Sequence, residues 1–261
     1  MELPLNIKKL LDGEEYKIDN IGKSDSQVLI FRDRVLKIVK YSSENEEKIQ
    51  MFRWIDGKLP VPKVICYEED ENFQYLLMSK VSGTMSCDEY YMSRPDILMP
   101  LLAEAIKMLQ SVDISGCTRD CGLDELLKEA RFRVENSLVD TSDAEPETYG
   151  ENGFKNPNEL LIWLENNRPE FEPALVHGDL CLPNIFLDKD KVSGFIDIGG
   201  MGVGDKWQDI ALCYRSLVHN ANGVYGGKVY PGIEPKALFD SLGIEPDWDK
   251  IRYFILLDEL F

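Results

Sequence analysis

The sequence predicts an α+β protein with two lobes, a small antiparallel sheet followed by a larger and mostly helical part. Residues 1–79 contain short runs rich in apolar and β-branched residues, separated by turn residues, which is typical of strands. From residue 84 onward, apolar residues recur mainly at helical spacing. The connector at residues 80–83 is expected to act as a hinge, and such an arrangement leaves a cleft between the lobes.

The first lobe is expected to contain antiparallel strands and one helix. Residues 26–31 and 34–40 are rich in apolar residues and flank a two-residue turn, so they should form a hairpin. Residues 42–55 should form a helix, with Ser43 as its cap and Gly57 just beyond its end. Two further strands are expected over residues 63–67 and 73–78.

The second lobe is expected to surround three short strands with helices. Residues 139–153 are acidic, polar and poor in apolar residues, so they should form a loop. The insert at 222–235, rich in glycine and tyrosine, should form a surface loop. The expected helices cover residues 95–112, 123–138, 157–166, 206–217, 236–242 and 248–260, and the strands cover 174–176, 185–187 and 193–198.

The overall charge restricts the possible partners. The chain has 29 Lys and Arg against 47 Asp and Glu, a net charge of −18. A surface this acidic disfavours nucleic acid and anionic membranes, and it either attracts cations or serves solubility. No apolar run is long enough to span a bilayer, and residues 1–6 do not resemble the start of a secretory signal. The six scattered cysteines form no zinc pattern and indicate reduced thiols in a cytoplasm.

One constellation carries the expected chemistry. Asp179 and Asn184 lie five positions apart on a short loop between apolar strands, and Asp197 ends an apolar strand 18 positions after Asp179. Phosphoryl transfer needs a carboxylate that orients the attacking hydroxyl, and oxygen ligands that hold Mg²⁺ against the phosphates. The order Asp, Asn, Asp matches these roles in the catalytic and metal-binding loops of kinases. His177, in the same run, is expected to be a packing residue.

A lysine in the first lobe is needed for the α- and β-phosphates. Lys37 lies in the run 34–40 and is favoured over Lys40. Its usual partner would be a glutamate on the following helix, for which Glu46 and Glu47 are candidates. The polar loop at residues 22–26 could cover phosphates with its backbone N–H groups.

These motifs resemble the aminoglycoside phosphotransferase family, and most closely its 3′-phosphotransferases. The resemblance extends over nearly the whole chain and is sharpest at residues 177–184, 194–197, 205–211 and 256–261. It implies a protein-kinase-like fold and transfer of phosphate from ATP, or sometimes GTP, to a hydroxyl of an antibiotic such as kanamycin or neomycin. It therefore implies antibiotic resistance, with a polycationic substrate that fits the acidic charge.

The resemblance also assigns roles to single residues. Asp179 matches the catalytic aspartate, and Asn184 and Asp197 match the magnesium ligands. Lys37 and Ser24 match residues that hold the nucleotide phosphates, with Glu47 as the candidate partner of the lysine. The residues that would hold the substrate's amines are Asp258, Glu259, the carboxylate of Phe261, and the loop residues Glu145, Glu147 and Glu151.

The chain departs from the family pattern at three positions. Gly200 replaces an arginine, Lys48 stands where the helix glutamate aligns without a gap, and Val35 stands near the position of an aromatic residue that can stack on adenine. Two alternatives therefore stay open: a kinase for another hydroxylated small molecule, such as a macrolide or an amino alcohol, or a nucleotide-binding pseudoenzyme. The acidic C-terminus favours the aminoglycoside kinase over the first alternative, and the intact motif residues argue against the second.

Overall fold

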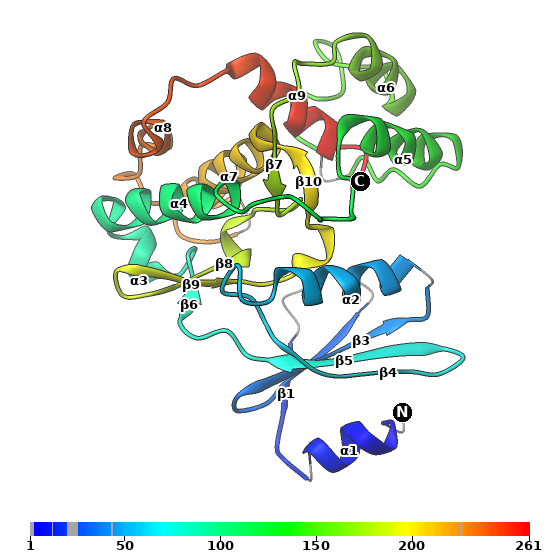
Figure 1. Cartoon of the computed structure of the whole chain (residues 1–261). Coiled ribbons are helices and arrows are strands. Elements are labelled where there is room, and N and C mark those ends of the chain that lie inside the picture. Colours follow the sequence, from blue (N-terminus) through cyan, green and yellow to red (C-terminus); the bar gives the residue numbers. More distant parts are fainter. Residues whose placement is uncertain (1–2, 12, 20–25, 43, 143, 225) are drawn as a thin grey trace.

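Two lobes of different construction make up the computed structural model of the chain (Figure 1). The structure describes residues 3–261 except 12, 20–25, 43, 143 and 225, and no side chains for residues 44–47. The first lobe is built on an antiparallel sheet, whereas the second holds most of the helices together with smaller sheets. The chain leaves the first sheet at Ser79, and its next strand begins at Thr84. The expected α+β architecture is confirmed.

The first lobe contains five described strands in the order β1-β2-β3-β5-β4, each antiparallel to its neighbour. In β3, Leu36 and Ile38 are buried in the core of this lobe. Lys37 lies between them, and because side chains alternate along a strand it points to the opposite face. The sequence did not predict β1, whose three residues are too short a run to give a period. The bounds are β1 Lys17–Asp19, β2 Gln27–Ile30, β3 Arg34–Lys40, β4 Val64–Glu69 and β5 Phe73–Ser79.

Two helices accompany this sheet. The helix α2 (Glu44–Ile55) was predicted, and its buried residues Phe52 and Ile55 join the main hydrophobic core of the second lobe. The proposed cap, Ser43, lies outside the described residues. The helix α1 (Leu5–Leu11) was not predicted, because seven residues give only two turns of apolar periodicity. It buries Ile7 and Leu11 in the core of the first lobe.

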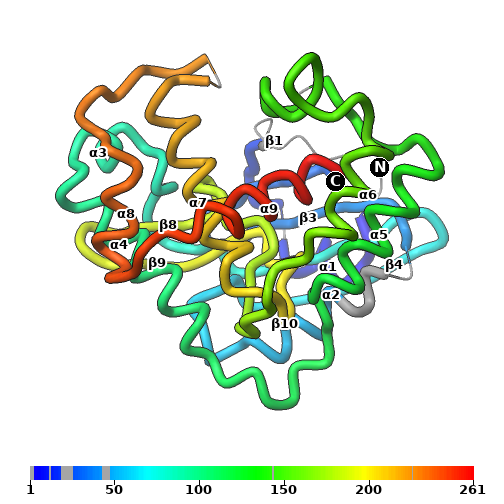
Figure 2. The backbone as a smooth tube through the Cα atoms, turned by 90° about the horizontal axis from the view of Figure 1, so that it is seen from above, coloured from blue at the N-terminus to red at the C-terminus, as the bar shows by residue number. Residues whose placement is uncertain are grey.

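The second lobe packs its helices around one large apolar core. Figure 2 shows α9 between α7 and α6, and α9 contacts both. No helix in the described part of the chain is long and apolar enough to cross a membrane. The bounds are α3 Glu89–Met92, α4 Pro95–Gln110, α5 Leu123–Glu135, α6 Pro157–Asn166, α7 Lys206–Ala221, α8 Ala237–Leu242 and α9 Trp248–Asp258.

Short strands and 3₁₀ turns of the second lobe carry the predicted site. The strand β7 pairs with β10, and the hairpin β8–β9 pairs with β6 through β8. The 3₁₀ turn η1 directly precedes β8, while η2 follows the end of β9 and contacts α2. The bounds are β6 Thr84–Met85, β7 Pro173–Val176, η1 Leu182–Asn184, β8 Ile185–Asp188, β9 Lys191–Phe195, η2 Ile198–Gly200 and β10 Gly202–Asp205.

Several expected boundaries were wrong. The strand expected over 193–198 stops at Phe195, because Asp197 adopts left-handed backbone angles that end the extended chain. The helix expected over 123–138 ends at Glu135, since Ser137 has φ 56°. The helix α7, by contrast, is longer than expected, because it continues past residue 217 to Ala221.

Candidate active site

The two predicted metal ligands come together because β8 and β9 form a hairpin. Ile185 pairs with Phe195, and the Ile196 N–H donates to the Asn184 carbonyl over 3.0 Å. Asn184 is thereby fixed beside the residue that precedes Asp197. At Asp197 the backbone turns into the left-handed region with φ 55°, which aspartate tolerates better than most residues. The turn therefore ends the strand at the residue whose carboxylate is a predicted metal ligand.

Lys37 reaches this carboxylate from the first lobe. Its Nζ donates to Asp197 Oδ1 over 2.7 Å, with the side chains 28% and 53% exposed. Partial desolvation would raise the pKa of Asp197, but the charge and hydrogen bond of Lys37, followed by His177 and Lys48, lower it below its usual value. Asp197 is therefore ionised at neutral pH, and the contact joins a strand of one lobe to the end of a strand in the other.

The carboxylate of Asp179 is held by two side chains. Asn184 Nδ2 donates to Asp179 Oδ2 over 3.0 Å and to the Asp179 carbonyl over 2.9 Å. Cys181 Sγ donates to the other carboxylate oxygen, Oδ1, over 3.0 Å. Burial first, and then the charge of Asp179, raise the pKa of the Cys181 thiol, so the thiol stays protonated and can donate. The carboxylate is oriented before any substrate binds.

The same arrangement leaves oxygen atoms suitable for a hard cation. Because the amide nitrogen of Asn184 donates to Asp179, its carbonyl oxygen points away from that carboxylate. Asp197 uses Oδ1 for Lys37, and its Oδ2 accepts no hydrogen bond from any residue that the structure describes. Among the described residues, no group of three or more His, Cys, Asp or Glu could hold a metal. Two protein oxygens completed by phosphates and water are the set that Mg²⁺ accepts, so the residues fit this ion.

The loop at residues 177–184, which carries the predicted catalytic residue Asp179, is here called the catalytic loop. Asp209 on α7 holds its backbone. One of its carboxylate oxygens accepts the His177 N–H over 2.7 Å, and the other accepts the Gly178 N–H over 3.1 Å. Complete burial raises the pKa of Asp209 to about 6. His177 is itself buried, with Nε2 2.9 Å from the Ile196 carbonyl, so it links the loop to the strand end that precedes Asp197. This contact agrees with the packing role predicted for His177.

Glycines let the catalytic loop approach the segment after Asp197. Gly178 has φ +87°, and a Cβ on it would lie 2.7 Å from the Gly200 carbonyl oxygen, so only glycine fits here. Two cations reach the same segment from other elements. Arg119 donates to the Gly199 carbonyl from the loop between α4 and α5, and Lys48 Cδ lies 3.6 Å from where a Gly199 Cβ would be. The segment without an arginine at Gly200 is thus still flanked by positive charge.

The predicted substrate-binding carboxylates at the end of α9 surround an arginine on α7. Arg215 forms an ion pair with Asp258, and its Nη1 lies 3.8 Å from Glu259 Oε1. Burial opposes the charge of Arg215, but Asp258 and Glu259 raise its pKa above the usual value. We call Arg215, Asp258, Glu259 and the carboxylate of Phe261 the C-terminal corner.

The last two residues are fixed by a second arginine. Arg133 on α5 donates through Nε to the Leu260 carbonyl over 2.9 Å and through Nη2 to an oxygen of Phe261 over 2.6 Å. Leu260 is completely buried in the core, whereas Phe261 is 45% exposed. The Phe261 oxygen that accepts from Arg133 therefore has a defined position, in a residue that is partly exposed.

The loop residues predicted to bind amines differ among themselves. Glu145 touches the C-terminal corner, since its backbone N–H lies 3.2 Å from Glu259 Oε1. Its carboxylate also lies 2.8 Å from His219 Nε2. Glu147 and Glu151 are exposed and make no ion pair with any residue that the structure describes. Ser24 and the side chain of Glu47 lie outside the described residues.

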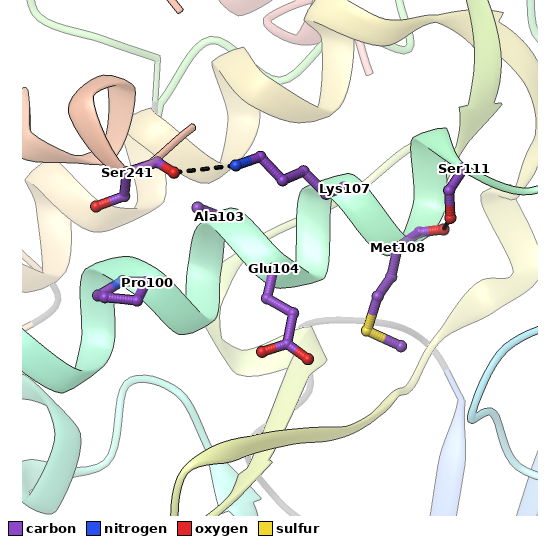
Figure 3. A pocket seen from close by; sticks show the side chains of 7 residues that line it. All are labelled: Pro100, Ala103, Glu104, Lys107, Met108, Ser111 and Ser241. Atoms are coloured by element: carbon purple, nitrogen blue, oxygen red, sulfur yellow. Dashed lines mark hydrogen bonds between the residues drawn. The ribbon is translucent and has the colours of Figure 1, made fainter. Parts of the chain in front are cut away.

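One surface groove in the described part of the chain lies away from the predicted site. It is an open groove of about 530 Å³ on the surface between α4 and α8, and no predicted site residue lines it. Figure 3 shows Lys107 spanning this groove, where its Nζ donates to the Ser241 carbonyl over 3.1 Å.

Sequence reasoning assigned no role to three residues that shape the site: Asp209, Arg215 and Arg119. Asp209 lies within the motif run 205–211, and its presence on an otherwise apolar helix face is a usable signal of a buried acceptor. Arg215 lies six positions further on the same helix. Arg119 gives no local signal, because its contact spans 80 residues of sequence.

Comparisons with known proteins support one family. The sequence model of the phosphotransferase enzyme family matches residues 21–252. An aminoglycoside 3′-phosphotransferase of Enterococcus faecalis is 41% identical over 94% of this chain and 88% of its own length. One from Staphylococcus aureus is 40% identical over 94% and 89%. One from Niallia circulans is 35% identical over 99% and 97%.

Solved structures agree in fold. The crystal structure of a type VIII aminoglycoside 3′-phosphotransferase superposes with a TM-score of 0.80 and 26% identity, covering 98% of this chain and 97% of that one. An aminoglycoside phosphotransferase from Streptomyces rimosus, acting at the 3″ position by its name, gives a TM-score of 0.81 at 24% identity over the same shares. With a kinase-like fold and relatives of one kind along its length, the chain belongs to the phosphotransferase enzyme family, in the group of the aminoglycoside 3′-phosphotransferases.

Proposed function

We propose that the chain transfers the γ-phosphoryl group of ATP or GTP to the 3′-hydroxyl of an aminoglycoside antibiotic and thereby confers resistance. Two contacts carry the proposal, and each of them joins two of the four motif residues. Lys37 meets Asp197 across the lobes over 2.7 Å, and Asn184 meets Asp179 over 3.0 Å. A phosphate-binding lysine, two oxygen ligands and an oriented carboxylate are the parts that phosphoryl transfer requires.

Asp179 is the group that receives the acceptor hydroxyl. With Asn184 and Cys181 on its two oxygens, the carboxylate has a fixed orientation and still has lone pairs for the incoming O–H. Accepting this hydrogen bond orients the hydroxyl oxygen for attack on the phosphorus and receives its proton as the new P–O bond forms. The product nucleoside diphosphate leaves from the opposite side of the phosphorus.

The nucleotide binds between the lobes. Asn184 and Asp197 would hold Mg²⁺, which would neutralise the negative charge of the phosphates. Lys37 contacts the α- and β-phosphates, and Ser24 and Glu47 keep the phosphate-loop and partner roles that the resemblance implies. In the free protein Lys37 pairs with Asp197, so nucleotide binding exchanges part of this ion pair for contacts with phosphate.

The acceptor is held by carboxylates. Ammonium groups of a polycation form charge-assisted hydrogen bonds with carboxylates, and the C-terminal corner offers Asp258, Glu259 and the terminus of Phe261. Glu147 and Glu151 add accessible negative charge on the loop between α5 and α6. The net charge of −18 draws such a substrate toward the protein from a distance.

The proposed setting is the cytoplasm, where nucleoside triphosphates are abundant and thiols stay reduced. All six cysteines are free in the structure, which fits this setting.

Nucleoside diphosphate release from purified chain tests the function. The chain is mixed with Mg-ATP or Mg-GTP and one acceptor at a time: kanamycin, its 3′-deoxy analogue, a macrolide or choline. We expect release with kanamycin and none above background with the other three. No release with any aminoglycoside would refute the proposed acceptor class. Equal release with kanamycin and its 3′-deoxy analogue would keep the class and refute the 3′ position.

A further inference from the structure

The acidic segment between α5 and α6, residues 139–142 and 144–154 and here called the acidic loop, has hydrogen bonds within it. The Thr148 N–H donates to the Glu145 carbonyl over 2.9 Å, and the Phe154 N–H donates to the Thr148 carbonyl over 2.8 Å. Thr148 is buried, and the ring of Phe154 packs on Trp163 of α6 with centroids 5.8 Å apart. The C-terminal half of the acidic loop is thus fixed to the helix that follows it.

The N-terminal half is fixed at Glu145, through contacts to two different elements. The Glu145 backbone N–H lies 3.2 and 3.3 Å from the two carboxylate oxygens of Glu259, just after α9. The Glu145 carboxylate meets His219 Nε2 of α7 over 2.8 Å, with side chains 27% and 15% exposed. The hydrogen bond from His219 lowers the pKa of Glu145, so the carboxylate is ionised at neutral pH.

His219 belongs to the same helix face as the arginine of the C-terminal corner. Arg215 and His219 are four residues apart on α7, so their side chains lie one above the other. Arg215 holds Asp258 and Glu259, and His219 holds the acidic loop against them. One face of α7 therefore sets both the position of the C-terminal carboxylates and that of the loop.

Glu147 and Glu151 stand in contrast. Both belong to the acidic loop, both are exposed, and neither has an ion pair within the part of the chain that the structure describes. Their carboxylates are available to an ammonium group. The Glu145 carboxylate, in contrast, is already paired with His219.

We propose that the contact between His219 and Glu145 is a latch that positions the acidic loop on the C-terminal corner for binding of the cationic acceptor. In this role Glu145 and His219 are positioning residues, and Glu147 and Glu151 are the loop carboxylates that face the substrate. The proposal rests on the proposed function for its link to the acceptor, although the latch itself is a property of the free protein.

A double-mutant cycle tests the link to the acceptor. We expect His219→Ala and Glu145→Gln each to raise the Michaelis constant for kanamycin about fivefold, the value of one partly exposed ion pair. The Michaelis constant for ATP should stay unchanged. The double variant should be no worse than either single one, because both changes break the same contact. His219→Gln keeps an N–H donor of similar reach and should restore most of the affinity.

Glu147→Gln is the matched control. It removes the same charge two residues away but not the contact with His219, so it should raise the Michaelis constant for kanamycin while leaving the loop in place. A lower Michaelis constant for kanamycin in His219→Ala would overturn the proposal, since it would show that the imidazole competes with the substrate.

Hydrogen exchange of the free chain tests the latch without any substrate. Opening the latch releases the backbone N–H of Glu145 and weakens that of Thr148, so these amides should exchange about fivefold faster in His219→Ala and Glu145→Gln. Exchange in Glu147→Gln should match the unaltered chain. Unchanged exchange in all three variants would refute the latch even if kanamycin is phosphorylated. Faster exchange in a chain that phosphorylates no acceptor would support the latch and refute the proposed function.

Discussion

Replacing Asp209 by asparagine tests how the catalytic loop is held. In the native state the carboxyl is completely buried, and its pKa is raised from 3.8 to about 6. A raised pKa means that the folded protein binds this proton more tightly than the unfolded chain does. The stabilisation is fully present below pH 3.8 and is lost as the pH rises through about 6. Asparagine has no such titration.

The size of the effect follows from the shift. At about 1.36 kcal/mol per pH unit, the interval between 3.8 and about 6 corresponds to about 3 kcal/mol of unfolding free energy. Somewhat under half of this, about 1.4 kcal/mol, is lost between pH 5 and pH 7.5. This range also avoids the isoelectric point near 4.6.

The assay is urea denaturation of both proteins at half-unit steps from pH 5 to pH 7.5. The unaltered chain should lose about 1.4 kcal/mol relative to Asp209→Asn over this range. All other titrating groups are shared and cancel in the difference. Parallel stability curves would refute the reasoning, because they would mean that Asp209 has the same proton affinity in both states. At a fixed pH, Asp209→Asn should also lower kcat. The His177 and Gly178 N–H groups meet different oxygens of Asp209, and the amide nitrogen that replaces one of these oxygens cannot accept a hydrogen bond.

Three further predictions concern the groups around the transferred phosphate and the acceptor. Asp179→Ala should abolish diphosphate release while leaving the Kd for ATP, measured by calorimetry, nearly unchanged; near-normal turnover would disprove its role. Lys37→Met should raise the Kd for ATP about tenfold or more, the value of a charge-assisted hydrogen bond, with kanamycin affinity as the unaffected control. Removing Phe261 alone should raise the Michaelis constant for kanamycin but not that for ATP, whereas removing the last four residues should lower Tm as well, because Leu260 is buried in the core. An equal rise in both Michaelis constants after removal of Phe261 would point to general disruption.

The sequence predicted those parts of the fold whose pattern is local. The strands β2 to β5 and the longer helices have enough residues to show a period, and all were expected close to their observed positions. The strand β10 was not, because Gly202 and Gly204 are poor strand formers and pair with β7 only through the closeness of the two backbones. A Cβ on Gly204 would come within 2.7 Å of Val176, so the pairing itself requires the glycine.

The site was predictable to the extent that its residues share one motif. Asp179, Asn184 and Asp197 lie within 19 consecutive residues, and the structure brings Lys37 to them from the other lobe. The supporting contacts were not predictable, because each joins distant segments. Arg119 reaches Gly199 across 80 residues, and Arg133 reaches Phe261 across 128. Such contacts leave no periodicity in the sequence, and only the fold brings the groups together.

The C-terminal corner also changes how the net charge should be interpreted. A charge of −18 suggests a surface of unpaired carboxylates that could bind cations. In the structure, however, Asp258 and Glu259 already contact Arg215, and Phe261 contacts Arg133. A carboxylate has about four lone-pair sites. The Asp258 side chain is 33% exposed, so it can keep its arginine and still accept from an ammonium group, whereas the Glu259 side chain is only 6% exposed and mainly holds Arg215 and the backbone of Glu145. The arginines fix the directions in which the remaining lone pairs point. The acidic surface therefore accounts for attraction of a polycation, and the paired carboxylates account for the orientation that would bring one particular hydroxyl to Asp179.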